Sequence, residues 1–319
     1  MRNTFLATLR EIAANNPNVW LLCGDLGFSV LETFQRQFPD RYLNVGVAEQ
    51  NMAGIAAGLA LSGKTVFIYS IGNFPTIRCL EQLRNDVCYH GADVKVVSVG
   101  GGFAYGSQGY THHAIEDVAI MSTLPGIDVL VPCDPIEVRV ATRLLSKSGR
   151  PAYLRLSRSG EPALHPSEPA DLSRPIFLRP GSDVVILASG PIAAACLAAA
   201  EMLAADFGQI GVASVPRLKP FDEQWVSEIA AGAKLIVTVE EQIARGGLYA
   251  AVAAALAGRP TGACVLGLAI PEPAGKISVA GDREALLARA GLSVDGIAAR
   301  IREAVASGPQ LRDLSAARV

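Results

Sequence analysis

The sequence is poor in charged and aromatic side chains and contains no cluster of charges of one sign. Charged residues make up 18% and aromatic residues 6% of the 319 positions, and the formal net charge is −2. Without a basic stripe there is no electrostatic reason to expect nucleic acid or an anionic membrane surface as a partner. Half of the residues are hydrophobic, which excludes a disordered chain and is enough for buried cores. The length predicts about two domains of ordinary size.

Cysteine motifs are also missing. The six cysteines form no CxxC pair, and their spacing matches no zinc site. They are Cys23, Cys79, Cys88, Cys133, Cys196 and Cys264. Most of them lie in apolar stretches, which predicts small buried side chains in a reducing compartment. We therefore expect no metal site formed by this chain.

Long uninterrupted apolar runs are absent from the sequence. Residues 1–17 carry charges inside an amphipathic helical pattern, which is not typical of a signal peptide. The most apolar stretch, residues 184–205, is interrupted by Ser189, Gly190 and Pro191. This stretch predicts a buried strand, a turn and a helix rather than a membrane span. From these features we expect a cytoplasmic protein.

Short β-branched runs alternate with helical patterns in the first half of the chain. Strands are expected at residues 19–25, 65–69, 94–99, 127–132 and 152–156, and helices at residues 48–61, at 75–88, from 114 and from 136. Continuous apolar strands alternating with helices indicate a parallel sheet covered on both faces. Right-handed crossovers then bring the loops that follow the strands to one edge of the sheet.

The composition changes after residue 160. Residues 161–182 are rich in Pro, Ser and Glu and lack periodicity, which predicts an interdomain linker. The alternation of strands and helices restarts at residue 183 and predicts a second, smaller α/β domain over residues 183–319. The expected fold is therefore α/β, with two parallel-sheet domains, the first at residues 1–160. We expect the tail after Gly308 to be frayed.

The first chemical motif is a carboxylate at the start of a helix of small residues. Glu49 lies in NVGVAEQNMAGIAAGLALSG, residues 44–63, where a strand and loop pass into a helix. The purely structural interpretation is a charge stabilised by the helix dipole. Residues 53–60 are nearly all small, so the helix must pack tightly and would partly desolvate a carboxylate at its mouth. This context favours a functional carboxylate.

The second motif is glycine-rich and reads GGGFAYGSQGYTHHAIEDVA, residues 100–119. Its glycines let the backbone approach a ligand closely, and His112 and His113 precede a helix. No G-x-G-x-x-G opens a helix directly after a strand, and G-K-[ST] is missing, so neither a dinucleotide loop nor a P-loop is indicated. The histidine pair has no third ligand in view, which argues against a metal site.

Together these motifs make the chain resemble a known family. The order GDLG, AEQNMAGIAAGLA, SIGNFPTIR, GSQGYTHHAIEDVA, PCDP and LRLSR resembles the pyrimidine-binding domain of transketolases, and resembles deoxyxylulose-phosphate synthases somewhat less. The later motifs LASGP, VPRLKPFD and VEEQIARGGL resemble the C-terminal domain of the same enzymes. The resemblance covers nearly all of the chain and identifies it as the C-terminal half of a split transketolase.

The resemblance implies a binding site for thiamine diphosphate. Glu49 matches the glutamate that hydrogen-bonds a ring nitrogen of the cofactor's aminopyrimidine. Sharing that proton favours the imino tautomer of the exocyclic amine, which then takes the proton from the thiazolium carbon. Phe74 matches an aromatic that packs on the pyrimidine, while Ile71 and Ile77 stand where many relatives have further aromatics. Asp25 follows the family's GD near the thiazolium, and a loop-capping role is the alternative for it.

The resemblance also implies contacts to a sugar substrate. His112 matches a histidine that contacts substrate oxygens near the reacting carbon, and His113 replaces the glutamine that usually follows it. Gln108 stands where transketolases usually have an aspartate that reads the hydroxyl stereochemistry of the donor, and Gly100 replaces a histidine that helps hold the acceptor phosphate. These departures leave the donor open.

Three residues match phosphate-binding positions of the family. They are Arg2, Ser29 and Arg158, and the alternative is that they are surface arginines and a loop serine. An arginine fork suits phosphate oxygens, so a phosphorylated sugar is the expected substrate.

One family motif is missing from the sequence. Transketolases bind the diphosphate through a metal, using a G-D-G motif followed later by an asparagine, and this chain has no such motif. The resemblance therefore implies that Mg²⁺ or Ca²⁺ and the diphosphate are held mainly by an N-terminal-half partner subunit. We expect an α2β2 assembly and an apolar surface on the first domain that receives the partner.

Two other functions stay open at this point. A ketoacid-dehydrogenase subunit of the E1 beta type has the same two domains, although its loop differs from THHAIED. A non-catalytic regulatory or binding homologue is motivated by the changes at Gln108 and Gly100. Pentose-phosphate metabolism, branched-sugar or sulfosugar catabolism and a secondary-metabolite pathway all fit the sequence.

Overall fold

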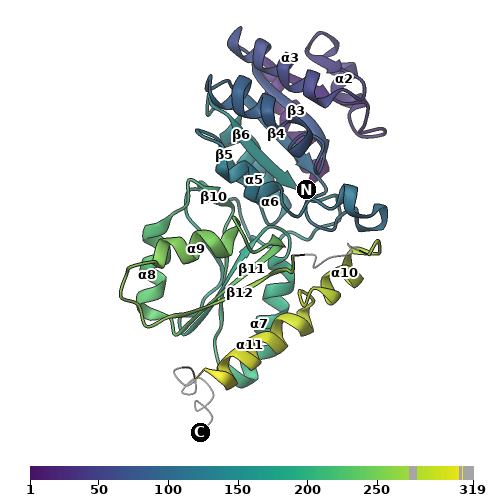
Figure 1. Ribbon diagram of the computed structural model, residues 1–319. Coiled ribbons are helices and arrows are strands. Elements are labelled where there is room, and N and C mark those ends of the chain that lie inside the picture. Colours follow the sequence, from purple (N-terminus) through teal and green to yellow (C-terminus); the bar gives the residue numbers. More distant parts are fainter. Residues whose placement is uncertain (273–278, 309–310, 312–319) are drawn as a thin grey trace.

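The computed structural model describes residues 1–272, 279–308 and 311 and contains two α/β layers built on separate sheets (Figure 1). The first sheet has seven strands in the order β10-β5-β6-β4-β3-β1-β2. Their bounds are β1 Val19–Cys23, β2 Tyr42–Asn44, β3 Thr65–Ile71, β4 Val94–Val99, β5 Asp128–Leu130, β6 Ala152–Leu156 and β10 Arg217–Lys219. All neighbouring pairs are parallel except β10 and β5. The expected α/β fold is confirmed, with an antiparallel edge strand that the sequence did not predict.

Helices cover both faces of the first sheet. They are α1 Arg2–Asn15, α2 Glu32–Gln37, α3 Glu49–Leu61, α4 Leu80–Gln82, α5 Asp117–Thr123 and α6 Pro135–Leu145. One apolar cluster joins α1 and α6 to the sheet through Phe5, Val138 and Phe67. A second cluster joins α3 and α5 to the opposite face through Met52 and Met121. Strands β3 and β4 are buried throughout except at the end of β3, as their mostly apolar sequences predict, although β4 also buries Lys95 and Ser98.

The second sheet has five strands in the order β12-β11-β8-β9-β7. Their bounds are β7 Ile176–Arg179, β8 Val184–Ser189, β9 Gly211–Ser214, β11 Leu235–Ile243 and β12 Cys264–Ile270. The helices around it are α7 Ala193–Phe207, α8 Glu223–Gly232, α9 Leu248–Leu256, α10 Arg283–Arg289 and α11 Val294–Ser307. Strand β7 pairs with β9 in the antiparallel sense, and the other pairs are parallel. The second sheet is therefore also mixed.

The two layers share a strand. Strand β10 lies between α7 and α8 of the second layer in the sequence, yet it pairs with β5 of the first sheet, with Arg217 opposite Leu130. Lys219 Nζ donates to the carbonyl of Ser122 over 2.8 Å and adds a second tie at this edge. One hydrophobic cluster continues across the boundary, so the layers pack as one body.

Several expected elements differ in detail from the structure. The expected helix at 75–88 is broken into a 3-10 turn at Ile77–Cys79, helix α4 and a π-helical turn at Leu83–Cys88. The expected linker at 161–182 contains strand β7, and Leu172 within it is fully buried. Helix α2 and strand β2 were not predicted. The tail after Gly308 lies outside the described residues apart from Leu311.

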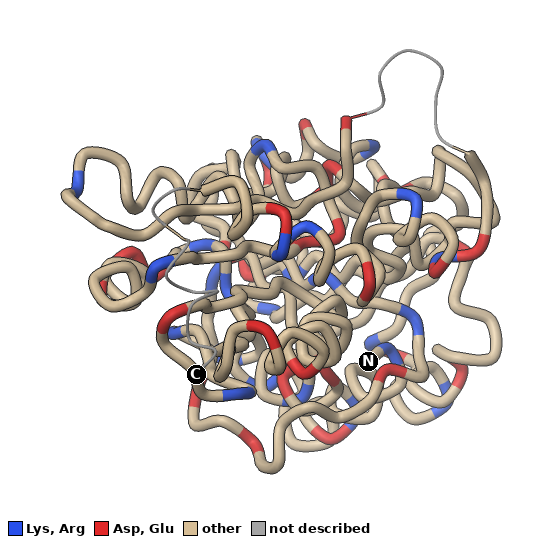
Figure 2. The backbone as a smooth tube through the Cα atoms, turned by 90° about the horizontal axis from the view of Figure 1, so that it is seen from below, with Lys and Arg blue, Asp and Glu red and all other residues tan. Residues whose placement is uncertain are grey.

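No helix in the described residues is long and apolar enough to span a membrane. All six cysteines lie in the described part of the chain, and each is a thiol rather than half of a disulfide. In Figure 2 acidic and basic residues are interspersed over the described part of the backbone, without a stripe of one sign.

Candidate active site

The predicted site residues come from loops that follow parallel strands of the first sheet. Glu49 opens α3, the segment 71–74 ends β3, and the loop 100–116 follows β4. Strands β1, β3, β4 and β6 run in one direction, so these loops meet at one edge of the sheet. This edge is where open α/β sheets bind ligands.

The carboxylate of Glu49 is buried and has a charged partner. Its side chain is 2% exposed, and Arg78 Nη1 donates to its Oε2 over 2.7 Å. Gly24 lies against it, because a Cβ atom at that position would be 3.3 Å from Glu49 Cγ. Gly24, the first glycine of the GDLG motif, thus leaves room for the Glu49 carboxylate. The expected desolvation of Glu49 is confirmed, and Arg78 was not predicted from the sequence.

Arg78 connects Glu49 to the aromatic of the predicted site. Its guanidinium carbon lies 4.5 Å from the centroid of the Phe74 ring, in a cation–π contact. The ring of Phe74 in turn meets the ring of His112 edge-on, with centroids 5.3 Å apart. The structure therefore brings Glu49, Arg78, Phe74 and His112 into one row. A hollow of about 660 Å³ lies beside this row, and Ile77 also lines it.

The two adjacent histidines have different environments. His112 lies near the surface, with its Nδ1 3.0 Å from the hydroxyl of Thr111. Burial, and to a smaller extent the neighbouring His113, lower the pKa of His112, which favours the neutral ring that can both donate and accept a hydrogen bond. His113 is fully buried, with its Nε2 3.1 Å from the carbonyl of Gly106. His113 thus holds the glycine-rich loop, while His112 is free to face a ligand.

Asp25 and Ser29 organise the loop after β1. Both have positive φ angles, 52° and 61°. Asn44 Nδ2 donates to Asp25 Oδ1 over 3.1 Å, and the backbone N–H of Asp25 donates to Asn44 Oδ1 over 2.9 Å. The N–H of Ser29 donates to Glu32 Oε1 over 2.6 Å. These contacts are loop-capping contacts, which were the structural alternative for Asp25.

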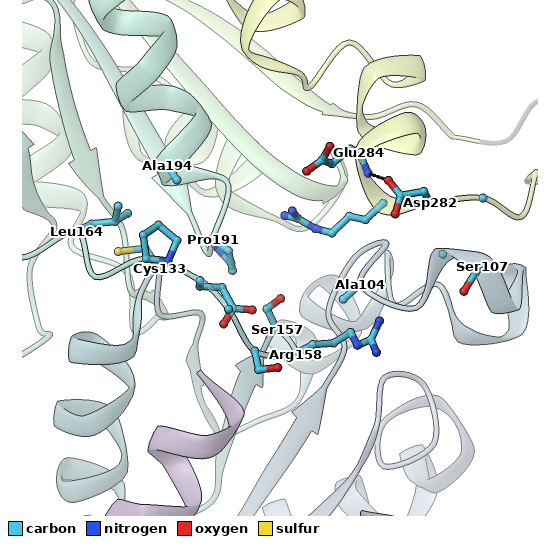
Figure 3. Close-up of a pocket in the computed structure, with 17 residues that line it drawn as sticks. Ala104, Ser107, Cys133, Ser157, Arg158, Leu164, Pro191, Ala194, Asp282 and Glu284 are labelled. Atoms are coloured by element: carbon cyan, nitrogen blue, oxygen red, sulfur yellow. Dashed lines mark hydrogen bonds between the residues drawn. The ribbon is translucent and has the colours of Figure 1, made fainter.

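Arg2 and Arg158 meet at the amino-terminal helix. The backbone N–H of Arg2 donates to the carbonyl of Arg158 over 3.1 Å, and the Arg158 guanidinium lies 5.0 Å from the Tyr105 ring centroid. Arg158 also lines a pocket of about 560 Å³ between the two layers (Figure 3). Ser107 lines the same pocket, and the adjacent Gln108 is exposed.

Gly100 is required by the packing of its own loop. Its φ angle is 93°, and a Cβ atom there would lie 2.2 Å from Tyr105 Cδ2 and Cε2. The ring of Tyr105 therefore fills the space that a side chain at position 100 would need. The replacement of the family's histidine by glycine is thus coupled to Tyr105, over which Arg158 lies.

A buried network of ion pairs and hydrogen bonds holds the glycine-rich loop, residues 100–116, in place. Arg155 Nε donates to Asp117 Oδ2 over 2.8 Å, and Arg155 Nη2 donates to the carbonyl of Glu241 over 3.0 Å. The Glu241 carboxylate accepts from the N–H of Phe103 over 2.8 Å and from Arg283 Nη2 over 2.5 Å. The loop that carries His112 is thereby fixed to both layers.

One group of side chains has the composition of a metal site. Cys133, Glu137 and His165 have ligand atoms within 4.8 Å of one another, and all three are buried. The Glu137 carboxylate already accepts from the N–H of Cys133 over 2.6 Å, and it lies 2.8 Å from His165 Nε2. Burial, joined by the Glu137 charge, raises the pKa of the Cys133 thiol well above its ordinary value, which favours the protonated form. In this arrangement the group links residues 161–172 to the start of α6.

Comparisons with known proteins cover both α/β layers. Residues 1–162 match the transketolase pyrimidine-binding domain, and residues 176–297 match the transketolase C-terminal domain. An apulose-4-phosphate transketolase subunit of Phocaeicola vulgatus is 33% identical over 299 residues, covering 93% of this chain and 94% of that protein. The 6-deoxy-6-sulfo-D-fructose transketolase subunit SqwH of a Clostridium species is 38% identical over 260 residues, covering 80% of each.

A solved structure agrees over nearly the whole chain. It is described as a split gene transketolase in an inactive beta4 tetramer and is 34% identical to this chain. The TM-score is 0.83, and the match covers 95% of this chain and 97% of the other.

Proposed function

The chain belongs to the transketolase family, as the C-terminal subunit of a split enzyme, and from this premise we propose how its residues take part in ketol transfer. The general reaction of the family moves a two-carbon ketol unit from a ketose to an aldehyde. The observation that carries the proposal is the row of Glu49, Arg78, Phe74 and His112 at the carboxyl edge of the first sheet.

The side chains at this edge fit the pyrimidine half of thiamine diphosphate. A planar ring with a protonated nitrogen needs a flat apolar face and a buried carboxylate, and Phe74 and Glu49 offer these at neighbouring places. When bound, thiamine diphosphate supplies the electron sink for breaking the carbon–carbon bond. In our proposal Glu49 holds a proton at the ring nitrogen, and Ile71 and Ile77 form the aliphatic wall beside Phe74.

The substrate contacts of the proposal lie around the hollow and the adjoining loops. His112 favours its neutral form and lies against Phe74, so it is suited to hydrogen-bond a sugar oxygen near the reacting carbon. Arg2 and Arg158 are joined through the backbone and carry guanidinium groups for an anionic end of the sugar. Gln108 is exposed on the same loop as His112 and is our candidate for reading the donor.

The loop after β1 completes the proposed contacts. In our proposal Asp25 would lie on the thiazolium side of the site, and it caps the loop through its bond with Asn44. Ser29 is placed by its N–H bond to Glu32 and offers its hydroxyl to a phosphate. Both roles follow from the family positions of these residues.

We further propose an N-terminal-half partner subunit that holds the diphosphate and Mg²⁺, in an α2β2 assembly. Exposed large apolar side chains concentrate in the first layer, where Phe28 and Val47 are 74% and 75% exposed. Gly54 and Gly58 on the outer face of α3 have no atom within 4 Å of an added Cβ, so another backbone could approach closely. The inactive tetramer of beta chains described for the solved relative is consistent with a need for a second type of subunit.

The substrates of the relatives suggest the class of sugar. Two relatives are named for apulose-4-phosphate and for 6-deoxy-6-sulfo-D-fructose, and both of these sugars carry an anionic group. We propose a ketose with an anionic end, a sugar phosphate first, as the donor. The thiol state of all six cysteines supports the proposal that the chain works in the cytoplasm.

The test is reconstitution with a candidate N-terminal-half subunit. The pair and the chain alone are supplied with thiamine diphosphate, Mg²⁺ and a panel of phosphorylated, sulfonated and neutral ketoses, and transfer of the two-carbon unit to an aldehyde is measured. We expect transfer only from the pair. Carbon dioxide release from pyruvate would replace this proposal by a ketoacid-dehydrogenase function. A formed complex that binds no cofactor would replace it by a non-catalytic role.

A further inference from the structure

Arg78 is the member of the site row that the proposed function leaves without a role. It lies in the 3-10 turn Ile77–Cys79, and it reaches both Glu49 and Phe74. We propose that Arg78 is a placeholder for the pyrimidine of the cofactor, so that it occupies the ring's place before the cofactor binds and must leave when the ring enters. This inference rests on the proposed function, because it takes Glu49 and Phe74 as the pyrimidine contacts.

The guanidinium makes the two contacts that the proposal gives to the pyrimidine. It is planar, it presents N–H donors in its plane, and its face stacks on aromatic rings. Nη1 donates to Glu49 Oε2 over 2.7 Å, as a protonated ring nitrogen would. The central carbon lies 4.5 Å from the Phe74 centroid, where a stacked ring would lie. The face of the Phe74 ring that the guanidinium covers cannot stack on the pyrimidine at the same time, so the two groups exclude each other there.

Burial of Glu49 explains why a placeholder is useful. Its side chain is 2% exposed, and an ionised carboxylate without a partner is strongly destabilising in such a place. Before the cofactor arrives, Arg78 supplies the positive charge and the hydrogen bond that the carboxylate needs. The carboxylate thus keeps a charged partner and its position for the incoming ring.

Arg78 is also able to leave. Its side chain is 44% exposed, whereas that of Glu49 is almost fully covered, so the guanidinium can move into water while the carboxylate stays. Glu116 lines the same hollow and offers a carboxylate near the path of the displaced guanidinium. The exchange therefore replaces one planar cation by another on a fixed carboxylate.

The test compares two arginine variants in the complex with the N-terminal-half subunit and Mg²⁺. Arg78→Ala removes the placeholder, and Arg84→Ala is the matched control, because the side chain of Arg84 is exposed and bonds to Asn85. Thiamine diphosphate is titrated by calorimetry, and its association is followed by stopped-flow fluorescence. If the state with Arg78 on Glu49 is about ten times more populated than the state with Arg78 displaced, Arg78→Ala should lower the dissociation constant for thiamine diphosphate about tenfold.

The kinetics provide a readout that a merely structural role would not change. In the wild-type and Arg84→Ala complexes the observed association rate should level off at high cofactor concentration, because departure of Arg78 limits it. In the Arg78→Ala complex the observed association rate should instead rise linearly with cofactor concentration. Weaker or unchanged binding by Arg78→Ala, with rates that level off as in the control, would overturn the placeholder.

A failure of the proposed cofactor is recognised separately. If none of the three complexes binds thiamine diphosphate, the proposed function is overturned, and the placeholder with it. Independently of cofactor binding, the ion pair itself is measured in the full chain by urea unfolding of Arg78→Ala, Glu49→Gln and the double variant. Non-additive effects show that the pair forms in solution, and additive effects contradict the contact on which the proposal stands.

Discussion

Glu240 should make the free energy of unfolding depend on pH near neutrality. The residue lies in β11 and is 1% exposed. Burial raises the pKa of its carboxyl from the ordinary 4.5 to about 7. The N–H groups of Leu248 and Tyr249 at the start of α9 donate to its oxygens over 2.7 and 2.8 Å. These bonds favour the charged form but do not cancel the effect of burial.

The sign and size follow from proton linkage. Between pH 4.5 and about 7 the folded chain keeps a proton on Glu240 that the unfolded chain has lost. Unfolding therefore releases a proton from Glu240 in this range, so the contribution of Glu240 to stability is greatest below pH 4.5 and falls as the pH rises toward 7. At about 1.36 kcal/mol per unit, the contribution of Glu240 falls by about 3 kcal/mol across this window.

Urea unfolding at pH 5, 6, 7 and 8 measures this contribution when wild type is compared with Glu240→Gln. The amide has nearly the same shape but does not titrate, so the pH dependence attributable to Glu240 should vanish in the variant. Other groups, His165 among them, titrate in both proteins and cancel in the difference. The reasoning is refuted if the difference in unfolding free energy between the two proteins is the same at pH 5 and pH 8.

Three further predictions concern the site and its support. Glu49→Gln should abolish ketol transfer in the reconstituted pair, since losing a proton-transfer group costs about 10²- to 10⁴-fold, while circular dichroism stays unchanged; substantial remaining activity would contradict its role. Gly100→Ala should lower the unfolding free energy by about 1–3 kcal/mol, because its Cβ would meet Tyr105, and Tyr105→Ala in the same chain should recover part of the loss. Equal stability of the single variant and wild type would refute this clash. Arg155→Met should cost about 3–5 kcal/mol in urea unfolding, because Asp117 stays buried without its charged partner and keeps only the hydrogen bond from the Tyr153 hydroxyl. A loss below about 1 kcal/mol, typical of an exposed pair, would show that the network relaxes.

The central strands were predictable because burial on both faces leaves a continuous apolar run. Strands β3 and β4 follow this rule, and their positions agree with the expectation to within two residues. The edge strands β7 and β10 have only four and three residues and contain arginines at partly exposed positions. Such short segments have no period that distinguishes them from a loop. The antiparallel edges of both sheets were therefore missed.

The candidate site was predictable as far as short motifs define it. The burial of Glu49 was predictable from its motif, because a carboxylate at the start of a helix of small residues is expected to be covered. The contact between Phe74 and His112 was not predicted, because the two residues belong to separate motifs. Arg78 was missed because its partner lies 29 residues away in the sequence, and only the folded sheet edge brings them together. The roles of these residues in binding and catalysis stay predictions.

Departures from the family pattern became interpretable only with neighbours in view. Gly100 looked like a lost phosphate contact in the sequence, and the structure shows that Tyr105 occupies the space. The replacement of glutamine by His113 is similar, because this histidine is fully buried and bonds to Gly106. Both changes serve the internal packing of the glycine-rich loop, and no local pattern in the sequence carries that information.

Strand β10 comes from the part of the chain that forms the second layer, yet it pairs in the first sheet. This pairing limits how the molecule could be recombined with others. A chimaera that exchanged everything after residue 182 would import a foreign β10, and its Arg217 and Lys219 would have to match a β5 edge with which they never coevolved. An exchange that kept β10 with its host sheet would instead interrupt the second layer between β9 and α8. The two layers are therefore poor modules for shuffling, and a working hybrid should exchange the whole chain as one part.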